Sequence, residues 1–466
     1  MATFAPTGEE SIVLPARAAA YSIPELRALF PAAFEEGGGF LLLDDHIVVA
    51  PGGSLDIRGP LDLRLASGAG QMTSIAGVSA TIRIGGGGSV SISSWNPETQ
   101  APDQTLDDGR AFLLMSAGQM DISDATFRYL GFGYGVTSGV AWKGLPGKPS
   151  GGAVIRSRFE GNYFGAYTFE SDGMRWVGNV FANNVIYGFD PHDYSNHFVV
   201  QGNEAFGNGK HGIIFSRGCS GNVITGNSSH DNGWHGIVLD DGKVRDDGNP
   251  RHEAAVPSDD NVIENNHVWN NKGVGIALEG GRGNVIRDNV IAGNRFGIRL
   301  KDDASRNQIV DNTISGSAVF GIYAFNSSSG NEIARNHVVG GKGGFVFKDA
   351  DRNRLTENQV VGVDGHAVAV MGNVGAMEIT GNSLSGKGSS AVDLLRVTEG
   401  SSVHAENDVS SWVVEPGFRL GKSLGDLFRT HPVLSVWMSV LLVPLVSSLL
   451  LWLWMQRRVL MVRSQR

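Results

Sequence analysis

The sequence has little cysteine and no excess of positive charge. A single cysteine, Cys219, occurs in 466 residues, so no disulfide can form within the chain. Lys and Arg number 38 against 47 Asp and Glu, which gives a net charge of −9. This balance argues against general binding of nucleic acid, which needs a basic surface. It also provides no long-range attraction for a polyanion, so any cations that bind one must act locally.

Two further patterns are missing from the first 400 residues. No positively charged stretch followed by an apolar run opens the chain, so no secretory signal is expected. No long amphipathic helical pattern occurs either, and the one short helix expected lies within 23–30. We assign residues 1–35 to a segment that caps the open end of the domain that follows, as repetitive folds require.

Glycine, in contrast, is abundant, with 65 residues, and short strand patterns repeat along the chain. Runs of the form Asn-Val-Ile-x-x-Asn recur every 22–24 residues, with one interval of 39 that places an insertion between Asp240 and Asp260. A second run, Gly followed by alternating apolar residues, keeps the same spacing from Gly165 to Gly344. Short strands separated by Asn- and Gly-rich turns predict an all-β fold, a right-handed parallel β-helix over residues 36–405. The period is too short for a propeller blade, and the RTX nonapeptide is absent.

Alternation after each repeat Gly predicts which side chains face outward. The first and third residues are apolar, as in Ile213 and Phe215, and are expected in the core. The second and fourth residues form an outward column: Tyr167, Asp190, His192, Ser216, Asp240, Glu279, Arg299, Lys301, Tyr323 and Lys348. Such a mixture is typical of a groove for a long polar ligand such as a carbohydrate polymer, although an ordinary solvated face has a similar composition.

One repeat departs from the others, because its strand ends in Asp190-Pro191-His192-Asp193. Arg217 follows 25 residues after His192, close to one repeat, so the two should lie on adjacent coils. A C–H beside a carboxylate is a very weak acid, and an Arg paired with that carboxylate makes the carbanion charge tolerable. A neutral His suits removal of the proton. We therefore predict His192, Arg217, Asp190 and Asp193 as catalytic residues, against the simpler reading of His192 as a surface residue.

The residues around this motif resemble a known family. Tyr187-Gly188-Phe189-Asp190-Pro191-His192-Asp193 and Lys210-His211-Gly212-Ile213-Ile214-Phe215-Ser216-Arg217 are similar to the periplasmic mannuronan C5-epimerases of bacterial alginate biosynthesis. The resemblance extends over roughly 40–400 and includes 134–138 and 157–160. It implies an isomerase that converts β-D-mannuronate units of a polymer to α-L-guluronate. His192 would remove the C5 proton, Arg217 would neutralise the C6 carboxylate, and water would return the proton from the other face.

Other residues near the same face are candidates for binding the polymer. Arg299 and Lys301 could bind carboxylates of neighbouring uronate units, or could pair with Glu279 or Asp302 instead. His211 and His235 precede their strand Gly and could line the groove or be structural. The predicted substrate-binding residues are Tyr187, His211, Asp240, Arg299 and Lys301.

We expect no cofactor and no required metal, since Asp240, Asp241 and Asp246 match no Ca²⁺ loop. Two alternative functions remain open. A polyuronate lyase would share the proton abstraction and expel the C4 oxygen, with Tyr187 as a possible proton donor. A non-catalytic module would bind polysaccharide as part of an export scaffold.

The composition changes near the C-terminus. Residues 433–454 carry no charge and are long enough to cross a hydrocarbon core of about 30 Å as a helix. Arg457, Arg458, Arg463 and Arg466 follow. We predict a juxtamembrane linker at 406–432, a single transmembrane helix at 433–455 and a basic cytoplasmic tail at 456–466, with a buried core helix as the alternative. The β-helix would then lie on the periplasmic side of the inner membrane, beside a polymer synthase or export complex.

Overall fold

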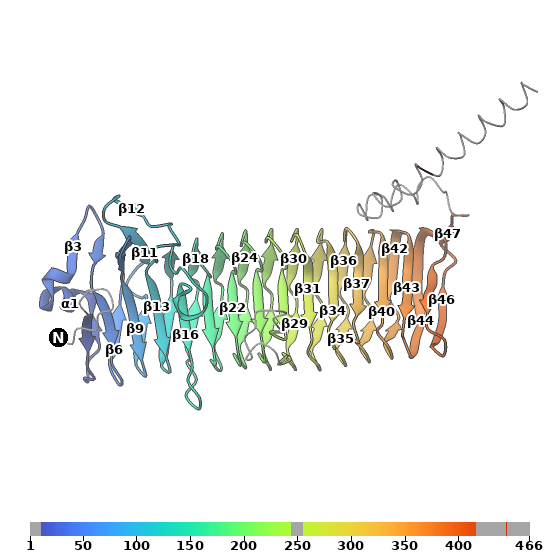
Figure 1. The fold of residues 1–466 in the computed structure, drawn as a ribbon, viewed down its shortest axis with the longest axis horizontal. Coiled ribbons are helices and arrows are strands. Elements are labelled where there is room, and N and C mark those ends of the chain that lie inside the picture. Colours follow the sequence, from blue (N-terminus) through green and yellow to red (C-terminus); the bar gives the residue numbers. More distant parts are fainter. Residues whose placement is uncertain (1–10, 244–254, 416–443, 445–466) are drawn as a thin grey trace, which may run out of the picture. The chain divides into compact units, whose positions relative to one another are not determined.

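Each repeat of the sequence forms one coil that contains three short strands. The computed structural model describes residues 11–243, 255–415 and 444. Coils follow one another along the stack in chain order (Figure 1). Equivalent strands of successive coils pair in parallel, residue to residue, so that each position of the repeat forms a column. The predicted parallel β-helix is therefore confirmed.

One strand of every coil enters a sheet of 15 strands, called the first sheet below. Its strands are, in order, β1 (Ser11–Leu14), β5 (His46–Val49), β9 (Ser74–Val78), β13 (Phe112–Ser116), β16 (Val140–Lys143), β19 (Ala166–Phe169), β22 (Phe189–His192), β25 (Ile213–Ser216), β28 (Ile237–Asp240), β31 (Val274–Glu279), β34 (Phe296–Lys301), β37 (Phe320–Phe325), β40 (Gly343–Lys348), β43 (His366–Gly372) and β45 (Val392–Val397).

The other two faces of the coils are rows of strands joined through β44. The second row contains β2 (Tyr21–Ser22), β6 (Ser54–Ile57), β10 (Thr81–Ile84), β14 (Gln119–Ser123), β17 (Ala153–Ile155), β20 (Arg175–Val177), β23 (Val199–Gln201), β26 (Val223–Thr225), β29 (Val262–Glu264), β32 (Val285–Arg287), β35 (Gln308–Val310), β38 (Glu332–Ala334), β41 (Arg354–Thr356), β44 (Ala376–Gly388) and β46 (Ser402–Asp408). The third row contains β4 (Leu41–Leu43), β7 (Leu61–Gly68), β11 (Val90–Asn96), β15 (Ala125–Arg128), β18 (Arg158–Glu160), β21 (Val180–Ala182), β24 (Glu204–Phe206), β27 (Ser228–His230), β30 (His267–Trp269), β33 (Val290–Ala292), β36 (Thr313–Ser315), β39 (His337–Val339), β42 (Gln359–Asp364) and, beyond β44, β47 (Trp412–Val414).

Short elements add to this frame near its N-terminal end. Strands β3 (Phe34–Glu36), β8 (Gln71–Met72) and β12 (Ala101–Pro102) pair antiparallel with β4, β7 and β11. The described residues include two 3₁₀ turns, η1 (Pro31–Ala33) and η2 (Gly135–Thr137). The predicted short helix is α1 (Ile23–Leu29), whose N-cap Ser22 accepts a hydrogen bond from the Glu25 backbone amide. Ile23 and Leu26 of α1 are buried in the core, as expected of a capping helix.

Ladders of buried asparagines hold the corners of the coils. The side-chain amide of Asn203 donates to Asn227 Oδ1 at 2.9 Å and to a backbone carbonyl, while Asn227 Oδ1 also accepts the backbone amide of Asn203. Equivalent chains of contacts run through Asn208 and Asn222 at the other two corners. Each asparagine side chain forms hydrogen bonds to both the preceding and the following coil, so its buried polar atoms all have partners. These bonds fix the register in which the coils stack.

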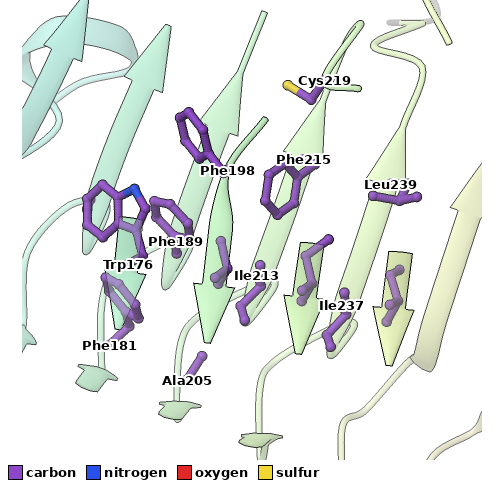
Figure 2. Close-up of a cluster of buried hydrophobic side chains, with 14 of the residues drawn as sticks. Trp176, Phe181, Phe189, Phe198, Ala205, Ile213, Phe215, Cys219, Ile237 and Leu239 are labelled. Carbon is purple, nitrogen blue, oxygen red and sulfur yellow. The ribbon is translucent and has the colours of Figure 1, made fainter. Parts of the chain in front are cut away.

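Aromatic and branched side chains fill the interior behind the first sheet. Figure 2 shows Trp176, Phe181, Phe189, Phe198 and Phe215 packed inside consecutive coils, and all five are fully buried. Residues predicted to face inward do so, since both members of every predicted pair are buried: Ile213 and Phe215, Ile237 and Leu239, Ile276 and Leu278, Ile298 and Leu300, and Phe345 and Phe347. A rigid, close-packed interior therefore supports the outward side chains of β22 and β25.

Two of the predicted features lie mostly outside the described residues. The insertion after Asp240 includes 244–254, of which the structure describes nothing. The predicted membrane span at 433–455 is described only at Pro444. Among the described residues, none of the helices has the length and apolar character needed to cross a bilayer.

Candidate active site

The Asp190–Asp193 motif lies at the end of β22, a central strand of the first sheet between β19 and β25. Strand alternation sends Phe189 and Pro191 inward and Asp190 and His192 outward. Strand β22 is in register with β25 only at its two end residues, because Pro191 has no amide hydrogen to donate. The motif thus replaces part of a regular strand ladder with a rigid, outward-facing Asp and His.

Asp193 joins His192 to Arg217 across adjacent coils. His192 Nδ1 lies 2.8 Å from Asp193 Oδ1, and Arg217 Nη1 donates to Asp193 Oδ2 at 3.3 Å. The first contact pairs the imidazole with a carboxylate and raises the pKa of the ring. The side chain of His192 is 32% exposed, whereas those of Asp193 and Arg217 are only 16% and 15% exposed. His192 is therefore the member of this group that is most open to a ligand.

Asp193 and Arg217 occupy a corner that turns the chain out of the first sheet. Both have left-handed backbone angles, with φ of 24° and 64°. Left-handed geometry costs a non-glycine residue roughly 1–2 kcal/mol. The corner is fixed by backbone bonds between coils, such as Arg217 N to Asp240 O at 2.9 Å. The same geometry recurs at the equivalent corner of other coils, as at Glu170 and Asp302, so it belongs to the turn of the repeat.

Burial and neighbouring acids perturb the pKa values of the motif. Burial raises the pKa of Asp190 to about 7, and the side chain is 1% exposed. For His192, burial by itself lowers the pKa, but Asp193, Asp190 and Asp240 together raise it above its ordinary value. For Asp193, burial opposes ionisation, yet His192 and Arg217 lower the pKa below its usual range. The site therefore places an ionised carboxylate between a histidine and a guanidinium.

The outward column continues from His192 through four further coils. His192 is in register with Ser216, Ser216 with Asp240, Asp240 with Glu279, and Glu279 with Lys301. Burial, and next the charge of Glu279, raise the pKa of Asp240 to about 6. The predicted outward column thus exists, and its middle is acidic.

Both predicted cations of this face contact Glu279. Lys301 Nζ lies 2.8 Å from Glu279 and 3.5 Å from Asp302, and Arg299 forms an ion pair with the other carboxylate oxygen of Glu279. Arg299 also lies 3.2 Å from His235 Nε2. The pairing of Arg299 and Lys301 with nearby acids, which the sequence left open as an alternative, is therefore present in the structure. A role for Arg299 and Lys301 in binding substrate stays a prediction.

A ladder of rings flanks the outward column on the side where each strand begins. The rings of Tyr187 and His211 stack at 5.3 Å, and those of His211 and His235 at 5.0 Å. Phe164 continues the ladder on the other side of Tyr187, at 4.9 Å. Burial lowers the pKa of His211 to about 3 and that of His235 to about 2, so both rings are neutral near pH 7.

The two histidines differ in their hydrogen bonding. His235 Nδ1 accepts the Val274 backbone amide at 2.8 Å, which is a structural role. His211 Nδ1 is buried without a hydrogen-bond partner among the described residues. Exposed rings extend the ladder outward, because Trp234 is 51% exposed and stacks on His211, and Tyr134 is 63% exposed beside Phe164.

The sequence pattern did not reveal this ladder as a continuous surface. The alternation of inward and outward side chains begins only after the repeat Gly. It therefore does not predict whether the residues before that Gly face the core or the solvent. Recurrence of a ring at the position before Gly, as in Tyr187 and His211, was the signal that could have shown it. Tyr134 belongs to a 3₁₀ turn region without repeat character, and only the fold places it there.

Two pockets of the described surface lie away from His192. A pocket of about 700 Å³ near Ser54, Arg83 and Gln119 contains none of the predicted site residues. A second pocket of about 380 Å³ borders the acidic part of the column at Asp241 and Asp302. Over the described ranges 11–243 and 255–415, no group of three or more His, Cys, Asp or Glu side chains is arranged to hold a metal ion.

Comparisons with known proteins agree with this fold. The family model for the right-handed β-helix region matches residues 111–252 and 244–384. Mannuronan C5-epimerase AlgG of Azotobacter vinelandii is 33% identical over 187 residues, which cover 37% of this chain and 34% of that protein. A mannuronan C5-epimerase of Pseudomonas syringae pv. tomato is 30% identical over 220 residues, covering 44% and 37%. The chain thus spans about a third of the length of the curated relatives it matches.

A solved structure resembles the whole β-helix more extensively. The crystal structure of the periplasmic alginate epimerase AlgG superposes with a TM-score of 0.62 and 21% identity, over 85% of each chain. At this identity the likeness is one of fold. Together with the family match it confirms the predicted right-handed β-helix, which has about 15 coils.

Proposed function

The chain belongs to the right-handed β-helix family, and on that premise we propose that it epimerises C5 of β-D-mannuronate units within a polysaccharide. One observation carries the proposal, namely that Asp193 contacts both His192 and Arg217 at the end of an outward-facing strand. The names of the matched relatives, which are mannuronan C5-epimerases, support the choice of reaction.

Each residue has a defined part in the proposed reaction. Arg217 pairs with the C6 carboxylate, so that the charge that develops when the C5–H bond breaks spreads over oxygens held by a cation. His192 takes the C5 proton through Nε2, while Asp193 faces its Nδ1. A water molecule on the opposite face of the sugar returns a proton to C5 with inverted configuration. No redox change and no leaving group are involved.

The electrostatics set a requirement on pH. The base must be neutral, yet the acids around His192 raise its pKa. The active fraction of the enzyme should therefore increase as the pH rises through that elevated pKa. In return, the same acids favour the imidazolium that forms once the proton has moved, which lowers the energy of the carbanionic state.

A polyuronate lyase remains the second candidate, and one observation favours it. Burial, and next Asp190, raise the pKa of Tyr187 far above its usual range, so this phenol stays protonated at neutral pH. Expulsion of the C4 oxygen needs a protonated donor of this kind within reach of the leaving group.

One experiment separates the candidates. The full-length protein and its His192→Ala variant are incubated with polymannuronate in D₂O and followed by proton NMR. Guluronate deuterated at C5 that disappears in the variant would establish epimerisation, whereas unsaturated chain ends would establish a lyase. If neither forms while the polymer still binds, the non-catalytic export scaffold is the better account.

The proposal includes a location. Residues 433–455 would anchor the chain in the inner membrane as a single helix, with the β-helix in the periplasm near a polymer synthase or export complex. The uncharged run and the four arginines after it support this arrangement. Protease added to spheroplasts should degrade the β-helix and spare a C-terminal tag, and the opposite pattern would reverse the orientation.

A further inference from the structure

The third row of strands presents an outer face that carries little charge. Figure 1 shows its strands β24, β30, β36 and β42 along one edge of the stack. In each third-row strand from β21 to β42 the second residue is buried, and the first and third point outward. Among these outward residues, all of which the structure describes, Glu204 is the only Asp, Glu, Lys or Arg. The second row of the same coils has five such residues, which are Arg175, Glu264, Arg287, Glu332 and Arg354.

Aromatic and apolar side chains lie in the middle of this face. Phe206, His230 and Trp269 are in register on β24, β27 and β30. The rings of Phe206 and His230 stack at 5.2 Å, and those of His230 and Trp269 at 4.0 Å. On the next coil, Val290 of β33 is 47% exposed. Glu204 lies beside this group, 3.3 Å from His230 Nε2. Partly exposed rings and aliphatic groups on one face are typical of the centre of a protein interface.

The face is flat, because the chain enters its strands through short corners. In every coil from β20 to β42, two residues separate the second-row strand from the third-row strand, as Gly202-Asn203 do between β23 and β24. The larger excursions of the chain leave elsewhere. The turn closed by Leu145 and Lys148 and the insertion after Asp240 both follow the ends of first-sheet strands. A second flat sheet can therefore pack against this face without meeting those loops.

Charges return at the borders of the face, and they have both signs. Asp311 pairs with Arg335 at 2.9 Å, and Asp364 lies 3.6 Å from Lys387. The other charged border residues are the acids Asp231, Asp288 and Glu357 and, toward the first sheet, the cations Lys210, Lys272, Arg295 and Lys342. A polar rim of mixed sign around a centre of low charge is the usual arrangement of a protein interface.

The area of the face suits a contact between two copies of the chain. Eight strands at the usual spacing span roughly 34 Å along the stack, and a three-residue strand with one corner residue on either side spans roughly 17 Å. The contact would bury roughly 600 Å² on each copy, which is at the lower end of the range for stable complexes. The net charge of −9 opposes association in general, so the face with the fewest charges is the one through which two copies meet at least cost.

We propose that two copies of the chain associate face to face through the third row between β21 and β42. A two-fold dimer uses the same patch on both copies, so one sequence supplies both sides of the contact. Phe206, Trp269 and Val290 lie near its centre, and the charged border stays in solvent. The first sheet is a different face of each coil, so His192 stays open in both copies. The dimer is independent of the proposed function, because its contact uses none of the residues of that site.

The mass of the full-length protein tests this contact. Light scattering in detergent, with the detergent mass subtracted, is measured from about 1 to 100 μM protein, the range in which contacts of this area associate. The wild-type mass should reach that of two chains. Val290→Glu should raise the dissociation constant at least tenfold, because it brings two carboxylates out of water at the centre of the contact.

Gln308→Glu is the matched control, since it adds the same charge at an exposed second-row position and should leave the dimer unchanged. Thermal unfolding shows whether both variants are folded. A wild-type mass of one chain at every concentration overturns the proposal and leaves the face to another partner. A dimer that both variants leave unchanged, or weaken equally, also overturns it.

Cross-linking locates the contact by a change that adds no charge. Cys219 is fully buried, so a cysteine introduced on the surface is the one that reacts. Val290→Cys lies beside the centre of the face, and a short bis-maleimide should join its two copies. Arg287→Cys is the control, because it lies on the second row of the same coil and is similarly exposed, and it should not be joined. Equal cross-linking of the two variants, as expected if residues 433–455 alone held the copies together, refutes the proposal.

Discussion

Replacement of Asp193 by Asn should shift the pH dependence of the reaction to lower pH. Asp193 Oδ1 lies 2.8 Å from His192 Nδ1 and is one of the charges that raise the pKa of His192. Coulomb's law gives that pair about 1.5 kcal/mol with the dielectric of water and about 6 kcal/mol at an effective dielectric of 20. Since 1.4 kcal/mol is about one pKa unit, the rising limb should move down by at least about one unit.

Asp240→Asn provides the comparison that makes this test quantitative. Asp240 also raises the pKa of His192, but it lies two coils away along the column, at about 9.6 Å by strand spacing. The same calculation gives about 0.4 kcal/mol in water, or about 0.3 pKa unit. The two variants should therefore shift the limb in the same direction, and Asp193→Asn should shift it by several times more.

The assay is C5 deuterium exchange measured between pH 5 and 9, with NMR titration of the His192 ring as an independent readout. Asp193→Asn should also lower kcat by tenfold or more, because the amide no longer stabilises the imidazolium. An upward shift of the rising limb, or an equal shift in both variants, would refute the assignment of Asp193 as the partner of His192.

Three further changes test other parts of the structure. Arg217→Lys should lower kcat/KM about 100-fold without unfolding the protein, because an ammonium group cannot form the two parallel hydrogen bonds that a guanidinium makes to the C6 carboxylate. Wild-type activity in this variant would exclude Arg217 as the group that binds that carboxylate. Asp190→Asn should stabilise the protein more at pH 7.5 than at pH 4. Because the folded-state pKa of Asp190 is raised to about 7, the folded protein loses stability as the pH rises from the unfolded-state pKa to that value, and the amide removes this loss. A thermal midpoint that changes equally at both pH values would contradict this. Asn227→Ala should cost about 2–4 kcal/mol by leaving amide groups of Asn203 unpaired, which a denaturant titration beside the exposed Asn326→Ala would measure.

The parts of the fold that depend on the repeat could be predicted from the sequence. A constant interval places equivalent residues in columns, so the inward position of Ile213 and Phe215 and the closeness of His192 and Arg217 followed from counting alone. The repeated Asn positions that form the ladders share the same interval. Three strands per coil did not, because a strand of three residues such as β27 (Ser228–His230) has no alternation that stands out from a turn.

The electrostatics of the site could not be predicted in the same way. Alternation places Asp190 on the outer face, and outward residues are usually solvated, yet Asp190 is 1% exposed. Aromatic side chains gather on this face at the neighbouring coils, with Tyr167 in register with Asp190. The choice of Glu279 as the partner of Arg299 likewise depends on side-chain conformations, which a repeat does not encode.

The β-helix separates the chemistry of this face from its specificity. His192, Asp193 and Arg217 lie on two consecutive coils, and their contacts use the corner between β22 and β25 and the coil that follows. Each later coil contributes its own residues to the same columns, so under the proposed function a substitution at Glu279 would change the surface beyond the reacting unit and leave the contacts of His192, Asp193 and Arg217 in place. Because the coils that carry Asp240 and Glu279 are held by their own asparagine contacts, such substitutions need not disturb the stack. Under the proposed function, a change of polymer would therefore require new residues at a few column positions rather than a new active site.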